Sequence, residues 1–229
     1  MKVKDMNVEV VRAEEGEVFD IELEEDILKR NSELAEANRR ILDRYKVTAI
    51  DVMGAIGSGK TALIEALAER LKNRYKIAMI AGDVTTTIDS MRVKRHGIET
   101  IQVNTGKECH LDANLINKAL RKLDLSTIDL LFIENVGNLI CPAEFDLGAH
   151  KRLVVVSVTE GEYMVVKHPY IFLASDVAVI NKIDLAEAMG VDPDKLCRDA
   201  EKIKPGIRVV KVSVKQGSGI EEVIKALDL

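Results

Sequence analysis

Short runs of mainly apolar residues alternate along the chain with longer amphipathic segments, and this alternation is its main structural signal. The runs hold four to six residues each, a length typical of buried strands. They begin at Val47, Ile77, Glu99, Ile128, Leu153, Asp176 and Arg208. Helices are expected between them, at residues 61–72, at 86–95, from Leu111, after Pro193 and from Ile220. Because strands that alternate with helices form parallel sheets covered on both faces, the pattern predicts a doubly wound α/β fold with a mostly parallel sheet.

A long amphipathic helix is expected before the first strand, at residues 22–44. Its apolar positions recur at sevenfold spacing with charges between them, and they are Ile27, Leu28, Leu34, Ala35, Ile41 and Leu42. Such a stripe packs either on the domain itself or on a partner. We therefore divide the chain into an N-terminal extension, residues 1–24, to which no role is assigned, and a single domain at residues 25–229 that includes this helix.

Length and composition exclude several classes of protein. A chain of 229 residues is long enough for one α/β domain with a large core and short for two. No run approaches the roughly 18 apolar residues of a membrane-spanning helix, and the first residues lack the apolar core of a signal peptide. Three cysteines cannot form a disulfide framework, so a reducing, cytoplasmic location is expected. The net charge of −5 argues against nucleic-acid binding.

A glycine-rich turn between the first strand and the following helix has the form of a phosphate-binding loop. Its residues fill the pattern G-x-x-x-x-G-K-[ST] with one further glycine, and they are Gly54, Gly57, Ser58, Gly59, Lys60 and Thr61. Consecutive backbone N–H groups can curl around a phosphate there, above the positive end of the helix dipole. We expect Lys60 to reach the β- and γ-phosphates and Thr61 to offer its hydroxyl to Mg²⁺.

A second polar cluster after an apolar strand predicts which base is bound. Asn181-Lys182-x-Asp184 places a carboxylate where it can accept two N–H bonds from guanine, which adenine cannot supply. Lys182 would lie along the base, and Ser213 and Lys215 after the last strand resemble the loop that accompanies this motif. The expected ligand is GTP, with GDP as the product form.

Carboxylates at the ends of two strands are candidates for Mg²⁺ binding and hydrolysis. Glu134 and Gly137 stand where many GTPases carry Asp-x-x-Gly, so Glu134 is expected near the metal and Gly137 near the γ-phosphate. Asp83 is the other candidate for holding Mg²⁺ or orienting the attacking water, and Asp89 is a weaker one. No residue is an obvious arginine finger, although Arg92 could act as one. The predicted catalytic set is therefore Lys60, Asp83 and Glu134.

A separate group of soft ligands predicts a transition-metal site. Cys109 and His110 are adjacent at a strand–helix junction, and Cys141 follows 32 residues later in a glycine-bearing loop. Thiolate and imidazole ligands suit Zn²⁺ or Ni²⁺. Three ligands make an incomplete shell, so the metal is expected to exchange or to be completed by another subunit. Cys197, on an expected helix, is interpreted as an ordinary buried thiol.

These segments together resemble the HypB family of GTPases, which help to insert nickel into [NiFe]-hydrogenase. The resemblance runs from about Glu25 to the C-terminus, and the segments that carry it are residues 54–61, 82–83, 104–112, 134–142 and 181–184. It implies a P-loop NTPase fold of the class that dimerises with nucleotide, GTP hydrolysis with Mg²⁺, and Ni²⁺ or Zn²⁺ on Cys109, His110 and Cys141 at the subunit interface. It also implies two partners, a nickel chaperone of the HypA kind and the precursor of the hydrogenase large subunit.

The chain departs from some members of that family at its N-terminus. No cysteine precedes Cys109 and no histidine precedes His96, so the N-terminal nickel motifs that some members carry are not expected to operate here. Two other functions stay open on the sequence alone. One is a GTPase that serves another nickel enzyme such as urease, and the other is a metal-binding carrier in which the nucleotide is only structural.

Overall fold

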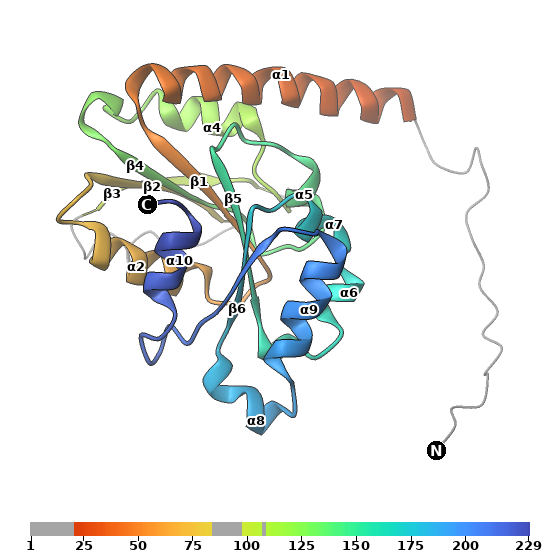
Figure 1. Cartoon of the computed structure of the whole chain (residues 1–229). Coiled ribbons are helices and arrows are strands. Elements are labelled where there is room, and N and C mark those ends of the chain that lie inside the picture. Colours follow the sequence, from red (N-terminus) through yellow and green to blue (C-terminus); the bar gives the residue numbers. More distant parts are fainter. Residues whose placement is uncertain (1–20, 84–97, 107–108) are drawn as a thin grey trace.

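A seven-stranded parallel sheet forms the centre of the molecule in the computed structural model, which describes residues 21–83, 98–106 and 109–229 (Figure 1). The strand order is β3-β2-β4-β1-β5-β6-β7, and each pair of neighbouring strands in this order is parallel. The strands are β1 (Thr48–Met53), β2 (Ile77–Asp83), β3 (Glu99–Asn104), β4 (Leu130–Glu134), β5 (Lys151–Ser157), β6 (Val177–Asn181) and β7 (Arg208–Lys211). The predicted doubly wound α/β architecture is confirmed.

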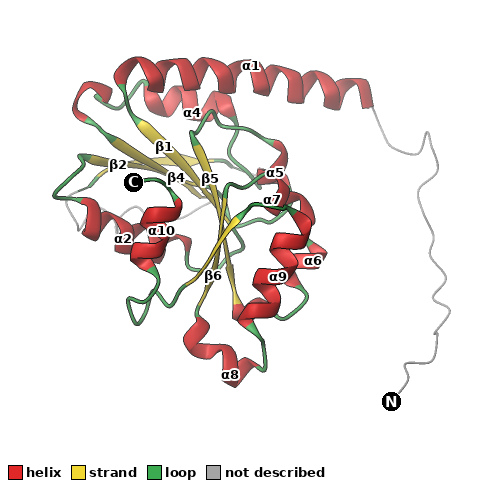
Figure 2. Ribbon diagram, in the orientation of Figure 1, coloured by secondary structure: helices red, strands yellow, loops and turns green. Residues whose placement is uncertain are grey.

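Helices cover both faces of this sheet (Figure 2). They are α1 (Ile21–Tyr45), α2 (Lys60–Leu71), α4 (Ala113–Leu120), α5 (Cys141–Glu144), α6 (Met164–Lys167), α7 (Pro169–Leu173), α8 (Ala186–Met189), α9 (Pro193–Ile203) and α10 (Ile220–Ala226). Short 3-10 turns lie at Leu125–Thr127, Val158–Glu160 and Ile183–Leu185. Among the described residues, none of the helices combines the length and apolar character needed to cross a membrane.

Alternation along the strands divides the apolar core between the two faces. Ile50 and Val52 of β1 belong to the cluster beneath α2 and α10, whereas Ala49 and Met53 point to the opposite face. On that opposite face two clusters lie side by side, one beneath α1 and α4 and the other beneath α6, α7 and α9. Asp51 lies on β1 between Ala49 and Met53, and it is fully buried.

The leading helix α1 packs on the domain. The sequence had left open whether it packs on the domain or on a partner. Its buried stripe differs from the predicted one, because Asn31 and Asn38 are buried while Ile27 and Leu34 are exposed. The Asn38 amide donates to the carbonyl oxygens of Ala113 and Leu147 at 2.8 and 3.2 Å. Ala35 and Leu42 of the predicted stripe are buried as expected. Hydrogen bonds to distant backbone, which leave no periodic apolar signal, therefore add to these apolar contacts in fixing the helix.

The predicted strands lie within two residues of their observed bounds, apart from the first, whose end was not specified. The helix expected at residues 86–95 falls outside the described part of the chain. The short helices α5, α6, α7 and α8 were not predicted, and α5 lies in a segment that we expected to be a loop. Helices of four or five residues span little more than one turn, which is too short to show a 3.6-residue period.

Candidate functional site

The phosphate loop connects β1 to α2 at the carboxyl edge of the sheet. Gly59 precedes α2 with φ 103°, a left-handed conformation that favours glycine. A Cβ atom on Gly59 would lie 2.3 Å from the side-chain nitrogen of Asn181, so the close approach of these two segments also requires glycine. Lys60 opens the helix, and its Nζ donates to the carbonyl oxygens of Gly54 and Ala55, each at 3.0 Å. The lysine head therefore lies over the loop, where a bound phosphate chain would run.

The segment after β4 packs directly against this loop. The hydroxyl of Thr61 donates to Oε1 of Glu134 over 2.7 Å, and both residues are buried. A Cβ atom on Gly137 would lie 2.3 Å from the side chain of Ile56, so Gly137 lies against the middle of the loop. Asn138 forms an isolated antiparallel bridge with Gly54. The structure thus brings Glu134 and Gly137 to the phosphate loop, as the sequence predicted.

Asp83 ends strand β2, in register with Asn104 of β3. The parallel pairing of β2 with β4 sets the end of β2 beside the strand that carries Glu134. The side chain of Asp83 lies outside the described part of the structure, as do Asp89 and Arg92 in full.

The two predicted base-binding segments meet at the ends of β6 and β7. The side chain of Asn181 donates to the carbonyl of Ser58 over 2.9 Å and accepts from the backbone N–H of Val214 over 3.4 Å. Lys182 donates from Nζ to the carbonyl of Gly57 over 2.7 Å. Asn181 and Lys182 therefore tie the phosphate loop to the ends of β6 and β7, where base binding is predicted.

Asp184 is held by a hydroxyl, which leaves part of its carboxylate for a ligand. Ser213 donates from Oγ to Oδ1 of Asp184 over 2.6 Å, and Ser213 is fully buried. Lys215 is exposed on the turn that follows. Asp184 and Ser213, two of the predicted base-reading residues, therefore lie together, and Lys215 follows two residues after Ser213.

One carboxylate beside these groups was missed by the sequence reasoning. Glu160 accepts from the backbone N–H of Ser157 over 2.9 Å, while its Oε2 is buried without a hydrogen-bond partner. Burial raises the pKa of Glu160, and the hydrogen bond from Ser157 together with the charges of Lys182 and Lys60 opposes that rise. The Lys182 Nζ also lies 3.5 Å from the hydroxyl of Thr159. The sequence feature that could have indicated Glu160 is its place in Thr-Glu-Gly, directly after a buried strand.

The predicted metal ligands form a compact cluster at the same edge of the sheet. One ligand atom from each of Cys109, His110 and Cys141 lies within 4.8 Å of the others. The Cys109 and Cys141 sulfurs are 3.0 Å apart, and Nδ1 of His110 is 4.0 Å from the Cys109 sulfur. The ring of Phe145 stacks on His110 with centroids 3.8 Å apart, so Phe145 fixes the direction of the imidazole. Two thiols and an imidazole at this spacing fit a Zn²⁺ or Ni²⁺ ion.

The neighbouring thiol controls the ionisation of Cys141. The hydrogen bond with Cys109 raises the pKa of the Cys141 thiol, and burial adds to that rise. Two thiolates 3.0 Å apart repel each other until a cation lies between them. A metal ion that binds here therefore has to displace protons.

Cys197 lies apart from this cluster, partly buried on α9, and burial raises the pKa of its thiol. This agrees with its interpretation as an ordinary thiol. Asn138, which the sequence reasoning also missed, donates from its side chain to the carbonyl of Cys109 over 3.4 Å. Its position next to Gly137 was the only available signal, because the contact joins segments 29 residues apart.

Comparison with known proteins identifies the family. The model of the CobW/HypB/UreG nucleotide-binding domain matches residues 48–211. A probable hydrogenase maturation factor HypB from Methanocaldococcus jannaschii is 54% identical over 208 residues, which cover 91% of this chain and 94% of that protein.

Two solved structures agree with this match. The crystal structure of hydrogenase maturation factor HypB from Archaeoglobus fulgidus has a TM-score of 0.82 at 50% identity and covers 87% of this chain and 98% of that chain. HypB from Helicobacter pylori in complex with nickel has a TM-score of 0.82 at 33% identity and covers 86% of this chain and 93% of that chain. The chain, with its phosphate loop and P-loop NTPase fold, therefore belongs to the HypB family of hydrogenase maturation factors within the CobW/HypB/UreG group of nucleotide-binding domains.

Proposed function

We propose that this protein is a GTP-hydrolysing metallochaperone that couples GTP binding and hydrolysis to the delivery of nickel into the precursor of [NiFe]-hydrogenase. The observation that carries the proposal is the position of Asn138. Its backbone pairs with Gly54 of the phosphate loop, and its side chain donates to the carbonyl of Cys109. One residue thus contacts both the nucleotide loop and a metal-ligand segment, which gives a physical route from one site to the other.

The nucleotide half of the proposal rests on the polar groups around the phosphate loop. Lys60 lies over the loop and supplies positive charge to the β- and γ-phosphates. The backbone of Gly137 lies against the loop, where its N–H can meet the γ-phosphate. Asp184 reads the N1 and amine protons of guanine, with Lys182 along the base. The ligand of this half is GTP, and its product is GDP.

The buried pair of Thr61 and Glu134 fits a hard cation. A hydroxyl and a carboxylate oxygen lie 2.7 Å apart beside the loop, and Mg²⁺ prefers oxygen ligands of this kind. We assign Mg²⁺ binding to Thr61, Glu134 and Asp83, where the ion would neutralise charge on the phosphates. We also assign Asp83, at the end of the neighbouring strand β2, the role of orienting the attacking water.

The transition metal is the cargo of the protein. Cys109, His110 and Cys141 supply its ligands, with Ni²⁺ as the physiological ion and Zn²⁺ as a competitor. The Helicobacter pylori relative, a HypB structure in complex with nickel, supports this choice. The Cys141 thiol, whose pKa is raised, has to lose its proton when the metal binds. The affinity for the metal ion should therefore fall as the pH is lowered.

A second copy of the chain is the proposed source of the remaining ligands. Three ligands leave a four-coordinate shell incomplete, and Cys109 is exposed. Apolar side chains beside the site are also exposed, at 86% for Ile56 and 59% for Ile140. We therefore propose a homodimer favoured by GTP, with a HypA-type nickel chaperone and the hydrogenase large-subunit precursor as further partners.

Metal titrations in two nucleotide states test this function. Ni²⁺ and Zn²⁺ binding to the parent and to Cys141→Ser would be measured with GDP and with a non-hydrolysable GTP analogue, while light scattering follows the oligomer. A coupling of about 1–3 kcal/mol between nucleotide and metal is expected, with the dimer favoured by the analogue. Equal metal affinity in both nucleotide states would refute the coupling.

Two further measurements separate this function from its alternatives. GTP turnover that survives in Lys60→Ala would favour a carrier with a structural nucleotide. Pull-down with hydrogenase and urease precursors would identify the nickel enzyme that is served, and capture of the urease precursor alone would redirect the proposal.

A further inference from the structure

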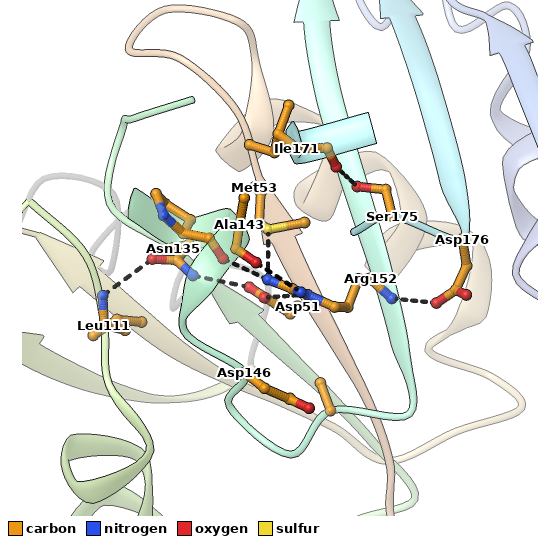
Figure 3. A network of polar contacts seen from close by, with 12 residues as sticks. Asp51, Met53, Leu111, Asn135, Ala143, Asp146, Arg152, Ile171, Ser175 and Asp176 are labelled. Atoms are coloured by element: carbon orange, nitrogen blue, oxygen red, sulfur yellow. Dashed lines mark hydrogen bonds and ion pairs between the residues drawn. The ribbon is translucent and has the colours of Figure 1, made fainter. Parts of the chain in front are cut away.

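A buried polar network crosses the sheet between the two apolar clusters of one face (Figure 3). At its centre Asp51 lies opposite Arg152 in the register of β1 and β5, with Oδ2 3.5 Å from the Arg152 Nε. The Asn135 side-chain nitrogen donates to Oδ1 of Asp51 over 3.1 Å. Nothing in the nucleotide or metal chemistry described above uses Asp51 or Arg152.

One end of this network holds the segment of Cys141. Both terminal nitrogens of the Arg152 guanidinium donate to backbone carbonyls of α5, one to Ala143 over 3.3 Å and the other to Pro142. These two residues directly follow Cys141, which is the first residue of the helix. Arg152 therefore sets where the Cys141 end of α5 lies relative to β1.

The other end holds the segment of Cys109 and His110. Oδ1 of Asn135 accepts from the backbone N–H of Leu111 over 3.2 Å (Figure 3). It also accepts from the backbone N–H of Val136 over 3.0 Å. Leu111 directly follows His110, and Asn135 directly follows Glu134. Asn135 thus joins the first ligand segment to the strand end that meets the phosphate loop.

Stability alone gives a poor account of such a network. A buried ion pair pays a large desolvation cost, and apolar residues of similar volume are often as stable or more stable in its place. Here Asp51 is fully buried, and its Oδ2 and the Arg152 Nε have no hydrogen-bond partner. The two terminal nitrogens of Arg152 donate to α5, and one of them also lies 3.3 Å from the Met53 sulfur. The network adds hydrogen bonds from Arg152 and Asn135 to particular partners, which apolar side chains cannot reproduce.

We propose that Asp51 and Arg152 are positioning residues that hold the two ligand segments at a fixed spacing, so that the thiols of Cys109 and Cys141 meet around the metal. The metal part of this inference rests on the function proposed above, whereas the spacing of the thiols does not. Asp51 is the common anchor, because Arg152 reaches one ligand segment and Asn135 reaches the other.

The spacing can be measured without metal, by equilibrating the protein with reduced and oxidised glutathione. The two thiols give up two electrons and two protons as they form one disulfide, and one oxidised glutathione becomes two reduced ones. The equilibrium constant reports the effective concentration of one thiol at the other. Cys197→Ala serves as the background throughout, so that only Cys109 and Cys141 react.

The informative variant is Asp51→Leu combined with Arg152→Met, which removes the network without leaving a buried charge. We expect it to keep the parent midpoint of urea unfolding while the effective concentration falls by about tenfold. Arg152→Lys keeps the positive charge but loses the forked guanidinium, and it should also lower the effective concentration of the two thiols. An unchanged effective concentration in a folded variant of either kind would overturn the proposal.

Arg208→Lys is the matched control. Like Arg152, Arg208 lies near the start of a strand, pairs with an aspartate and donates to a helix carbonyl, with its Nη1 2.7 Å from Asp228 and 2.6 Å from the carbonyl oxygen of Ala226. It lies on the opposite side of β6 from β5, and its substitution should leave the effective concentration unchanged. An equal decrease in this control would mean that general loosening of the fold explains the result.

Nickel affinity separates this inference from the proposed function. The double variant should bind Ni²⁺ roughly 10–100-fold more weakly than the parent, and adding Cys141→Ser should then cause little further loss. If Cys141→Ser alone binds Ni²⁺ as the parent does, the proposed metal site is wrong, and the glutathione equilibrium still decides the role of the network. If Cys141→Ser weakens Ni²⁺ binding and the folded double variant does not, the network proposal is wrong.

Discussion

The hydroxyl of Thr61 and the carboxylate of Glu134 are joined by a 2.7 Å hydrogen bond between residues 73 positions apart. The contact places the start of α2 against the end of β4, and it brings together two oxygen groups beside the phosphate loop. In the function proposed above, a cation held by these oxygens depends on Thr61, whereas Lys60 supplies its own positive charge to the phosphates. The two residues should therefore differ in how their loss responds to Mg²⁺.

We expect Thr61→Ala and Lys60→Ala both to slow GTP turnover by at least about tenfold, because each removes stabilisation of charge in the transition state. Raising the Mg²⁺ concentration should restore much of the turnover of Thr61→Ala, since mass action offsets a weaker site. It should restore little in Lys60→Ala. Thr127→Ala, which removes an exposed hydroxyl from a 3-10 turn, serves as the control. Rescue of the lysine variant alone would show that the two roles are reversed.

The carboxylate of Asp184 gives a prediction for base specificity. In Asp184→Asn, an amide nitrogen faces the N–H groups of guanine, so GTP affinity should fall by roughly 2–5 kcal/mol. Xanthosine triphosphate, which offers a carbonyl oxygen in place of the guanine amine, should bind the variant better than GTP does. Competition against a fluorescent nucleotide measures both affinities. Parent-like GTP binding by Asp184→Asn, or equal ATP turnover by the parent, would refute the guanine assignment.

Ser213→Ala tests the contact that orients this carboxylate. The variant loses the 2.6 Å hydrogen bond to Asp184 but keeps the carboxylate itself. We expect GTP affinity to fall by about 0.5–1.5 kcal/mol, the net value of a single hydrogen bond, with no gain for xanthosine triphosphate. A loss as large as that of Asp184→Asn would mean that Ser213 contacts the base directly.

The sequence predicted the sheet, and it predicted that most of the candidate site residues lie near one another, because those features are local. The phosphate loop and Asn181-Lys182-x-Asp184 each directly follow an apolar strand, and parallel strands end at one edge of the sheet. For the same reason Cys109, His110 and Cys141 were predicted to belong to one metal site, and the structure places them together.

Contacts between distant segments were not predictable in the same way. The stacking of Phe145 on His110 joins two loops, and the bridge between Gly54 and Asn138 joins residues from different strand ends. Asp51 was visible as a charged residue inside an apolar strand, but its partner Arg152 depends on the register of β1 and β5. Registers between non-consecutive strands are set by packing of the whole sheet, which periodicity along one segment does not encode.

Phe145 provides a test of the geometry at the metal cluster. Its ring lies 3.8 Å from that of His110 with an interplanar angle of 29°, so the imidazole has few other orientations. We expect Phe145→Leu to weaken Ni²⁺ binding roughly tenfold, because a free imidazole has to be ordered when the metal binds. GTP affinity should change little. Tyr45→Leu, at an exposed aromatic residue on α1, is the control. Equal Ni²⁺ affinity in Phe145→Leu would mean that the stacking does not orient a ligand.

The ionisation of Asp51 predicts how stability depends on pH. Burial raises the pKa of this carboxyl to about 6, against the opposing effects of the Arg152 charge and the Asn135 hydrogen bond, while Asp146 adds to the rise. Between about pH 4 and pH 6 the folded protein keeps a proton that the unfolded chain has lost. Unfolding then releases a proton, so this group's contribution to the free energy of unfolding falls as the pH rises through that window and is constant above it.

Asp51→Asn has no proton to lose at this position, and its comparison with the parent isolates the effect. The free energy of unfolding of the parent minus that of the variant should decrease by about 2–4 kcal/mol between pH 4 and pH 7, since one unit of pKa corresponds to 1.36 kcal/mol. Urea unfolding at several pH values measures both proteins, and the common titration of other groups cancels in the difference. A difference that is constant with pH would show that Asp51 is already ionised at pH 4, and a difference that increases would mean that the Arg152 charge outweighs burial.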